Sequence, residues 1–336
     1  MPDFVNPGPR LAQSGAAIGA SLGQIRTFAG NFTWPNYNSP DMDATPRDIK
    51  LQLAWRDHDR HWRDNRYVYP VISRRSRGLS VGVNLNPDKA CNFDCIYCQV
   101  DRSAPSAIRK VDLDIVRAEL TDLLDRAIAG SLFNDAPFDV LPADQRVVRD
   151  IAFSGDGEPT TFAKFDAAVS LAAELKAARG LDDTKIVLIT DACYLTKPTV
   201  RQGLAIMDEN NGEIWAKLDA GTQAYYAAIN RPNYPLSHVL ENILDAARAR
   251  PIVIQSLWMR VHGEPPPDAE VRAFCDRIRE LLEAGARIRL IQVYTIARET
   301  TEPWATALAP EELSRVAGAI ETETGMDIES FGGAIG

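Results

Sequence analysis

The sequence predicts an α/β protein built as a partial (β/α)6 TIM-like barrel of parallel strands, with an irregular N-terminal extension. From residue 79 onward, short runs rich in β-branched residues alternate with stretches of helical periodicity. Such alternation produces a parallel sheet with right-handed crossovers, which carries its functional site at the carboxyl ends of the strands. Hydrophobic residues make up 45% of the 336 positions, enough to build a core of this size.

The core is expected to contain six strands, separated by helices. The predicted strands cover Leu79–Leu85, Asp150–Ser154, Lys185–Thr190, Glu213–Asp219, Pro251–Met259 and Arg287–Ile296. Asp112 and Thr161 are the expected N-caps of the first two helices, and Pro310 suits the first turn of the last one. The side chains expected to face the sheet include Leu113, Val116, Leu120, Leu123, Leu124, Ile128, Phe165, Val169, Ala172, Leu175, Leu313, Val316 and Ile320.

Composition divides the chain into an N-terminal extension, residues 1–78, and a barrel core, residues 79–336. Within the extension, aromatic residues alternate with arginines. Such a segment can stack on bases and grip phosphates, or it can cover the barrel as a lid, with arginine stems on apolar surface. The residues concerned are Trp34, Tyr37, Trp55, Trp62, Tyr67 and Tyr69, with Arg47, Arg56, Arg60, Arg63, Arg66, Arg74, Arg75 and Arg77.

Charge and hydropathy exclude two classes of protein. The formal net charge of −9 argues against a protein that coats nucleic acid through an overall basic surface. No apolar run approaches the roughly 20 residues that a membrane span requires. The first residues lack the basic and apolar regions of a signal peptide, so a cytoplasmic location without membrane contact is expected.

The most informative segment holds three of the five cysteines. Cys91, Cys95 and Cys98 follow the first predicted strand in a C-x3-C-x2-C pattern, so one loop can bring three thiolates to one site. Thiolates select soft metals, either zinc or an iron–sulfur cluster. A four-iron cluster usually takes four cysteines, and the loop offers three, which leaves one iron open for another ligand.

Other ligand sets remain open. Zinc would take the three cysteines and one histidine, and a ferredoxin-like electron carrier would need a fourth ligand. Cys275, in a predicted helix, is expected to be a small buried residue, and a core role is also favoured for Cys193 at the rim. The candidate histidines are His58, His61, His238 and His262, none of which shows zinc-finger spacing with the cysteines.

The cysteine loop, with Tyr97 directly before its last cysteine, resembles the signature of the radical S-adenosylmethionine (radical SAM) superfamily. The resemblance implies one [4Fe-4S] cluster held by Cys91, Cys95 and Cys98. Its open iron would bind the amino and carboxylate groups of S-adenosylmethionine. Reductive cleavage of that cofactor would give a 5′-deoxyadenosyl radical that abstracts a hydrogen from the substrate. Backbone amides of residues 92–97 are expected to bond to the cluster.

Further motifs fit the same superfamily. Gly155-Asp156-Gly157-Glu158-Pro159 resembles its Gly-Gly-Glu-Pro motif, with Asp156 in place of the first glycine, and Thr190-Asp191-Ala192 is similar to an element near the cofactor ribose. Lys217 replaces a serine in a Ser-Leu-Asp-Ala-like element. The implied S-adenosylmethionine contacts are Tyr97, Gly157, Glu158, Thr190, Asp191, Lys217, Asp219 and Gln255. No catalytic residue is expected beyond the cluster.

Within the superfamily, residues 79–325 look most like the branch around wybutosine synthesis, a tRNA-modifying group of iron–sulfur oxidoreductases. The chain has no cysteine before Cys91 and so lacks the second-cluster cysteines of that branch. Only the radical-generating half of the reaction is therefore expected to carry over. Asn230, Arg231 and Pro232 are expected either to shape the substrate pocket or to form a structural turn with an arginine salt bridge. Arg260, His262 and Arg298 are expected at the rim, in reach of the substrate or of the cofactor carboxylate.

The resemblance implies a low-potential electron donor of the flavodoxin or ferredoxin type as a partner. The substrate is left open between tRNA or other RNA, a small molecule and a peptide. The alternative function, from another class, is a zinc-stabilised RNA-binding protein that uses the arginine- and aromatic-rich extension and performs no catalysis.

Overall fold

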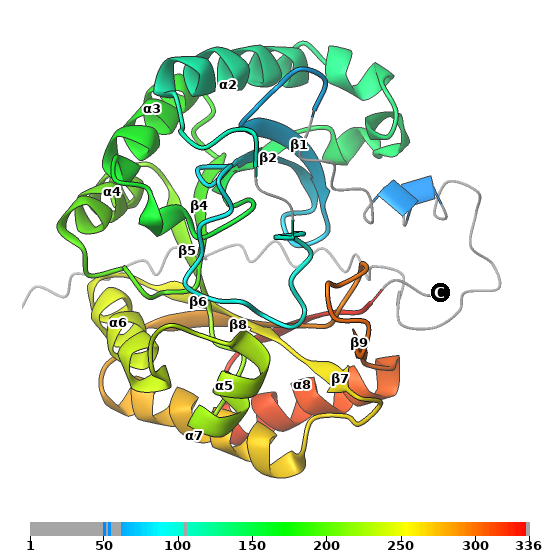
Figure 1. Cartoon of the computed structure of the whole chain (residues 1–336). Helices are drawn as coiled ribbons and strands as arrows, with labels where there is room; N and C mark the ends of the chain where they lie inside the picture. Colours follow the sequence, from blue (N-terminus) through cyan, green and yellow to red (C-terminus); the bar gives the residue numbers. More distant parts are fainter. Residues whose placement is uncertain (1–49, 52, 55–61, 104–105, 334–336) are drawn as a thin grey trace, which may run out of the picture. The chain divides into compact units, whose positions relative to one another are not determined.

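The computed structural model of the chain describes residues 50, 51, 53, 54, 62–103 and 106–333. The chain divides into a unit of residues Met1–Asn36, which lies outside the described residues, and a unit of residues Tyr37–Gly336. The second unit contains an eight-stranded sheet in the order β1-β2-β3-β4-β5-β6-β8-β10. The sheet curls into a half-barrel with helices on its outer face (Figure 1), as the sequence predicts.

Seven strands of this sheet run parallel, and β1 pairs antiparallel with β2. All six predicted strands are present, with ends shifted by a few residues. The strands are β1 (Val68–Ser73), β2 (Gly78–Val83), β3 (Val148–Phe153), β4 (Lys185–Thr190), β5 (Gly212–Lys217), β6 (Ile252–Leu257), β8 (Ile288–Tyr294) and β10 (Ile328–Phe331). A separate two-stranded sheet pairs β7 (Met259–Val261) with β9 (Ala305–Ala307).

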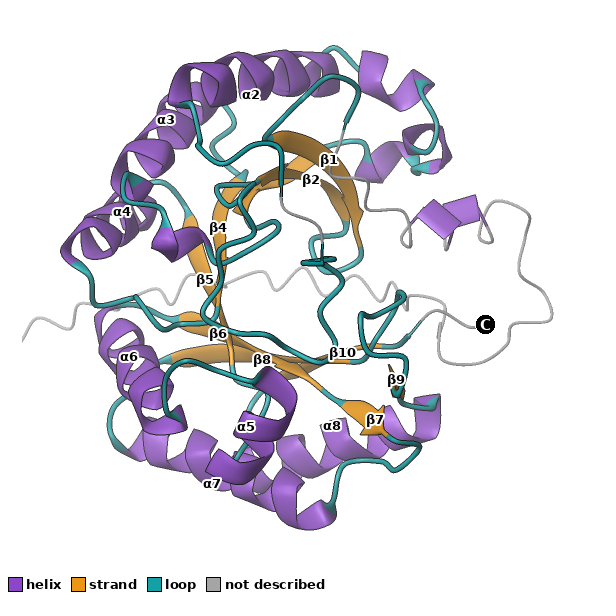
Figure 2. Cartoon of the chain, viewed as in Figure 1, coloured by secondary structure: helices purple, strands orange, loops and turns teal. Residues whose placement is uncertain are grey.

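Helices connect consecutive parallel strands along the outer face, as Figure 2 shows by colour. They are α2 (Leu113–Ile128), α3 (Phe165–Ala177), α4 (Pro198–Glu209), α5 (Gln223–Asn230), α6 (Leu236–Ala249), α7 (Asp268–Glu283) and α8 (Pro310–Thr324). Four short 3-10 turns complete the connections: η1 (Ser131–Asn134), η2 (Phe138–Val140), η3 (Ala143–Gln145) and η4 (Pro159–Thr161). Each parallel pair is thus joined by a crossover, which places all the strand carboxyl ends on one rim.

Two of the predicted helix starts are confirmed and one is wrong. The Asp112 carboxylate accepts a hydrogen bond from the Asp114 amide at the start of α2, and Pro310 occupies the first turn of α8. Thr161 does not cap α3, which begins four residues later. The Thr161 side chain is used in η4 instead, where its hydroxyl donates to the Glu158 carbonyl oxygen at 2.7 Å.

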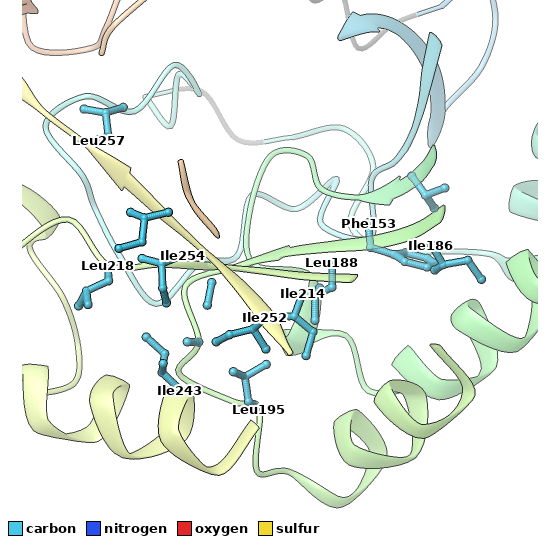
Figure 3. Packing of buried hydrophobic residues seen from close by; sticks show 14 of the residues in the cluster. Phe153, Ile186, Leu188, Leu195, Ile214, Leu218, Ile243, Ile252, Ile254 and Leu257 are labelled. Carbon is cyan, nitrogen blue, oxygen red and sulfur yellow. The ribbon is translucent and has the colours of Figure 1, made fainter. Parts of the chain in front are cut away.

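The main core lies between the sheet and its helices. Branched side chains of the strands interlock there with the inner faces of the helices, and Figure 3 shows this packing around Ile214, Ile243 and Ile252. A smaller cluster of Ala152, Val187, Trp215 and Val253 fills part of the concave face. Ile128, predicted to face inward, is 52% exposed because it is the last residue of α2, beyond the part of the helix that contacts the sheet.

The strand β1 lies in the segment that sequence analysis placed in the N-terminal extension. It pairs with β2 through a hairpin at residues 74–77, in which Arg77 has a positive φ of 56°. At the opposite edge, β10 pairs with β8 in parallel. These two added edge strands widen the half-barrel beyond the six predicted strands.

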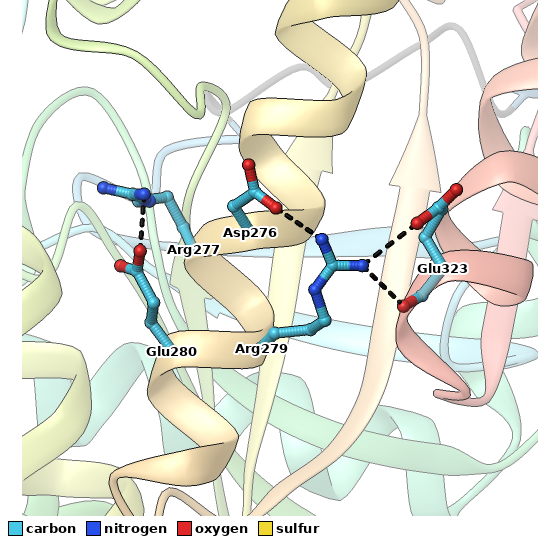
Figure 4. Close-up of polar contacts among 5 residues, drawn as sticks. All are labelled: Asp276, Arg277, Arg279, Glu280 and Glu323. Carbon is cyan, nitrogen blue, oxygen red and sulfur yellow. Dashed lines mark hydrogen bonds and ion pairs between the residues drawn. The ribbon is translucent and has the colours of Figure 1, made fainter.

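Outside the core, ion pairs tie neighbouring helices together. The Arg279 guanidinium on α7 lies between Asp276 on the same helix and Glu323 on α8, and Arg277 pairs with Glu280 (Figure 4). Such exposed pairs each contribute at most about 1 kcal/mol, so burial of the helix faces holds this layer in place. Among the described residues, no helix is long and apolar enough to cross a membrane.

Candidate metal centre and cofactor cavity

A cavity of about 290 Å³ opens inside the half-barrel. Its lining comes from the β1–β2 hairpin, the cysteine loop, and residues on or just after β3, β4, β5, β6, β8 and β10. The predicted site residues on this lining are Cys91, Cys95, Tyr97, Cys98, Gly157, Glu158, Thr190, Asp191, Lys217 and Gln255. Eight separate stretches of sequence thus meet at one place, at the rim where the parallel fold is expected to carry its site.

The cysteine loop is fastened to α5. The amide of Asp94 donates to the Asn230 carbonyl oxygen at 3.0 Å, and the amide of Ile96 donates to the Ile229 carbonyl oxygen at 2.9 Å. These two amides, expected to bond to a cluster, are therefore already used to hold the loop. The fastening presents the three thiols of the loop, all free and half-buried, to the cavity.

Burial makes two of these thiols hard to ionise without a cation. Burial, with the nearby Asp191 and Glu158, raises the pKa of Cys91 to about 12, and burial raises that of Cys95 to about 11. A thiolate is the form that binds metal, so metal binding here must release protons and supply the compensating charge. Within the described part of the chain, no three Cys, His, Asp or Glu side chains are arranged to hold a single metal ion.

One arginine that sequence analysis did not single out contacts the loop. The Arg102 guanidinium donates to the Cys98 sulfur at 2.9 Å and reaches the Asp156 carbonyl oxygen at 3.4 Å. Burial alone would lower the pKa of Arg102, but the adjacent Cys98 sulfur raises it above its ordinary value. A fixed cation therefore lies directly beside one of the three candidate sulfur ligands.

The turn after β3 packs tightly against the cysteine loop. A Cβ at Gly157 would overlap the carbonyl oxygen of Ala90, so only glycine fits at this position. The next amide, that of Glu158, donates to the same Ala90 oxygen at 2.9 Å. The Asp156 carboxylate, at the position that departs from the resembled motif, accepts a hydrogen bond from the Asn84 side-chain nitrogen at 2.7 Å. The turn and the cysteine loop are therefore held tightly against each other.

The Glu158 carboxylate is buried and joins the ends of two strands. One of its oxygens accepts hydrogen bonds from Thr160 and, at 2.7 Å, from the Thr190 hydroxyl. The other accepts from the Asp191 amide at 2.7 Å. Burial, followed by repulsion from the Asp191 carboxylate, raises the pKa of Glu158 to about 8. Burial likewise raises the pKa of Asp191, which accepts from Asn92 and the Cys193 amide.

Beneath the loop, Tyr97 belongs to a polar cluster. Its hydroxyl donates to Asp219, and the Asn230 side-chain amide reaches both of these groups, at 3.1 and 3.0 Å. The Lys217 ammonium lies 5.1 Å from the centre of the Tyr97 ring. Burial would lower the pKa of Lys217, but the surrounding Tyr294 and Asp219 raise it. Asp219 does not line the cavity; it holds Tyr97 and accepts from the Leu257 amide at 2.8 Å.

Gln255 is fully buried on β6 and lines the cavity. Its side-chain nitrogen donates to Gln292 at 2.8 Å, and its side-chain oxygen has no hydrogen-bond partner in the described structure. A buried amide oxygen without a partner costs free energy, so it favours a ligand that can donate to it.

The other residues predicted at the rim are divided between the cavity and structural contacts. Arg298 lines the cavity. Arg231 pairs with Glu302 at 2.7 Å, and Arg260 is paired with Glu312. These two ion pairs could not be predicted from the sequence, because each arginine is far along the chain from its partner.

The described histidines and remaining cysteines do not join the cysteine loop. His262 stacks on Trp304, and His238 stacks on Tyr234 and bonds to the Cys193 carbonyl oxygen. Cys193 and Cys275 are buried. His58 and His61, like most of the arginine- and aromatic-rich extension, lie outside the described residues.

No family model matches the chain. Among curated proteins, it is 23% identical over 301 residues to the GTPase Obg of Brachyspira hyodysenteriae, covering 87% of this chain and 39% of that protein. It is 29% identical over 176 residues to the UPF0026 protein MJ1312 of Methanocaldococcus jannaschii, covering 52% and 46%. A UPF0026 protein of Helicobacter pylori strain 26695 is 29% identical over 178 residues, covering 52% and 49%.

The matches therefore span less than half the length of each of these relatives. The sequence has no Gly-Lys pair, which the phosphate-binding loop of P-loop GTPases contains. Among solved structures, the chain is similar to the crystal structure of archaeal TYW1, with a TM-score of 0.39 and 14% identity over 74% of this chain and 73% of that one.

Proposed function

We propose that this chain is a radical SAM enzyme. Cys91, Cys95 and Cys98 hold one [4Fe-4S] cluster, and S-adenosylmethionine binds beside it in the cavity. The observation that carries the proposal is that three free, half-buried thiols from one loop line the same cavity as Glu158 and Lys217. The sequence motifs that resemble the superfamily come from separate strands, and the fold brings them to one rim.

The donor set fits a cluster better than a single ion. In a four-iron cluster each cysteine binds a different iron, so the three sulfurs need not converge on one point. The described residues offer no such convergence for one ion. Zinc would also need a histidine or a fourth thiolate, whereas His238 and His262 are stacked on aromatic rings elsewhere.

When bound, the cluster would supply one low-potential electron for cleavage of the sulfonium of S-adenosylmethionine into methionine and a 5′-deoxyadenosyl radical. The chain's own residues position the cofactor. Glu158 fixes the turn of residues 155–158, whose carbonyl oxygens would accept the methionine ammonium. The Lys217 ammonium lies where it can attract the methionine carboxylate, and Gln255 offers an unused acceptor.

The half-barrel protects the radical. Apolar side chains such as Ile189 and Leu257 share the cavity lining with the polar groups. A site that excludes water limits side reactions of a reactive intermediate. We propose that the electron comes from a flavodoxin or ferredoxin type of donor, and that the protein acts in the cytoplasm without membrane contact.

The test is anaerobic purification followed by reduction in the presence of S-adenosylmethionine. The expected result is a brown protein with iron and sulfide in equal amounts, which releases 5′-deoxyadenosine. Cys91→Ala, Cys95→Ala and Cys98→Ala should each abolish the release, because each removes one ligand of the cluster. Cys275→Ala is the matched control, since this thiol is buried in α7, and it should retain the cluster and the cleavage.

A colourless protein that binds one zinc would contradict the proposal and favour the RNA-binding alternative. Release of 5′-deoxyadenosine by all three cysteine variants at the wild-type rate would contradict it equally. Metal and sulfide analysis should accompany the assay, so that loss of the cluster is distinguished from loss of cofactor binding.

A further inference from the structure

The cavity continues past the cysteine loop to a second, basic region, here called the arginine end. It consists of Arg74 and Arg75 of the β1–β2 hairpin and Arg298 from the loop after β8. The residues come from opposite edges of the half-barrel. Neither the cysteine loop nor the cofactor contacts proposed above use them.

Arg75 has an unusual environment for a guanidinium. It lies over the Trp215 ring and over the Tyr294 ring, 5.4 Å from the centre of each. No hydrogen bond or ion pair to a described residue is found for Arg75, although a guanidinium carries five donors. Ring faces attract the cation, but they accept no hydrogen bond from the N–H groups that lie in the plane of the guanidinium.

The charge of Arg75 is only partly compensated among the described residues. The carboxylate that attracts Arg75 is Asp150, which forms no ion pair with it in the described structure and accepts from the Ser80 hydroxyl at 2.5 Å. Burial, followed by repulsion from Arg75, lowers the pKa of Arg74 to about 10. A desolvated cation such as Arg75, without an ion-pair partner among the described residues, costs free energy. That cost is recovered when an anion binds to the Arg75 guanidinium.

Arg75 lies between two levels of the half-barrel, which are marked by the Trp215 and Tyr294 rings. Trp215, which Arg75 covers, precedes Lys217 by two residues on β5, so both side chains point into the barrel and lie about 7 Å apart along the strand. Lys217 lies at the level of the cysteine loop, against Tyr97. Tyr294, the other ring that Arg75 covers, lies two residues nearer the carboxyl ends of the strands than Lys217, because Lys217 pairs with Gln255 and Gln255 pairs with Gln292. A molecule held by Arg75 would therefore lie at about the level of Lys217, beside the proposed cofactor contacts.

We propose that the arginine end binds an oxyanion, a carboxylate or a phosphate, carried by a small-molecule substrate. As a substrate assignment, this inference rests on the function proposed above. The planar guanidinium matches either oxyanion with two parallel hydrogen bonds. A cavity of about 290 Å³ with arginines in its lining suits a compact molecule rather than a folded RNA.

The test measures binding to the full chain, purified anaerobically, by isothermal titration calorimetry. The probes are phenyl phosphate and benzoate, with neutral benzamide as the matched control ligand. At least one anionic probe should bind and benzamide should not. Arg75→Gln should weaken that binding by about tenfold or more, since hydrogen bonds to charged groups contribute roughly 1.5–3 kcal/mol. Arg75→Lys keeps the charge but loses the planar guanidinium, so its affinity for the probe should lie between those of the wild type and Arg75→Gln.

The matched control variant is Arg77→Gln. Arg77 belongs to the same hairpin and loses the same charge, but it is exposed, pairs with Glu329 and does not line the cavity. It should bind the probes as the wild type does. Equal binding by wild type and both Arg75 variants, or equal binding of benzamide, would overturn the proposal. Arg75-dependent binding of a short single-stranded RNA, without binding of either small anion, would also overturn it.

The experiment separates this inference from the proposed function. Iron, sulfide and 5′-deoxyadenosine release are measured on the same preparations. Arg75-dependent anion binding in a protein that never holds a cluster would retain the anion site and reject the radical chemistry. Cluster-dependent cleavage without Arg75-dependent anion binding would reject the anion site alone.

Discussion

Arg102 has the most direct effect on the proposed cluster of any side chain that is not a ligand. Its guanidinium donates to the Cys98 sulfur at 2.9 Å. Hydrogen bonds and positive charge at the sulfurs favour the reduced, more negative state of an iron–sulfur cluster. Arg102→Gln should therefore lower the midpoint potential by on the order of tens of millivolts, because tenfold in an equilibrium constant is about 59 mV for one electron.

The potential is read from a redox titration followed by electron paramagnetic resonance, which does not depend on turnover. Arg109→Gln is the matched control, since Arg109 lies in the same loop between β2 and α2 but is exposed and outside the cavity lining. Arg102→Lys should recover part of the shift. An unchanged potential in Arg102→Gln would assign this arginine to loop structure, with no role in tuning the cluster.

Single residues also show where sequence reasoning reaches its limit. The spacing of the three cysteines and the glycine at position 157 could be identified because each obeys a local rule. Arg102 and Arg75 could not, because arginine is common at surfaces and only the fold reveals what each guanidinium meets. Asp219 was expected at the cofactor, but its bonds to Tyr97 and to the Leu257 amide depend on strands that are distant in sequence.

The contact between the β5–α5 loop and α7 depends on one glycine. A Cβ at Gly221 would overlap the backbone of Ala273 and Phe274, and the Gly221 amide donates to the Glu270 carboxylate at 2.6 Å. Gly221→Ala should therefore lower the free energy of unfolding by about 1–3 kcal/mol, the usual cost of forced overpacking.

Gly318 provides the opposite case on a neighbouring helix. A Cβ there would meet no atom within 4 Å, and the residue lies inside α8. Gly318→Ala should raise the free energy of unfolding by roughly 0.5–1 kcal/mol through helix propensity and a less flexible unfolded chain. Urea unfolding of both variants checks the pair. Equal effects at the two glycines would show that the close approach of the loop and α7 does not control stability.

The elements that sequence analysis identified share a strong local signal. The six central strands are apolar runs between helices, and α2 and α8 have a clear cap or a proline in the first turn. The strand β1 was missed because its residues, Val68–Ser73, lie among arginines and aromatics that favoured an irregular extension. The strand β10 is only four residues long, so it gives little periodicity to read.

On the scale of the whole molecule, the half-barrel contains two regions. The rim site could be predicted from the sequence, and the arginine end could not. The rim follows from the fold class, since every parallel strand ends there. The depth of the cavity does not follow, because it depends on the β1–β2 hairpin at one edge and the residues after β8 at the other. The arginine end therefore became visible only when both edges were placed.

The buried acids give the folded chain a pH dependence of its own. Burial is the main cause that raises the pKa of Glu158 to about 8 and also raises those of Asp150 and Asp191. The folded state therefore binds a proton that the unfolded state releases near pH 4.5, the ordinary value for Glu158. Under linkage, the free energy of unfolding falls as pH rises through this interval, by about 1.4 kcal/mol per pH unit for one group, and levels off above the folded-state pKa.

Urea unfolding of the metal-free protein at several pH values between 5 and 8 measures this slope. Glu158→Gln keeps the shape of the side chain and removes its titration, so it should flatten the curve in this interval and gain stability relative to wild type as the pH rises. Asp166→Asn, at a partly exposed carboxylate on α3, is the matched control and should leave the slope unchanged. A wild-type slope retained in Glu158→Gln would mean that this carboxylate is already ionised in the fold, stabilised by Thr160, Thr190 and the Asp191 amide.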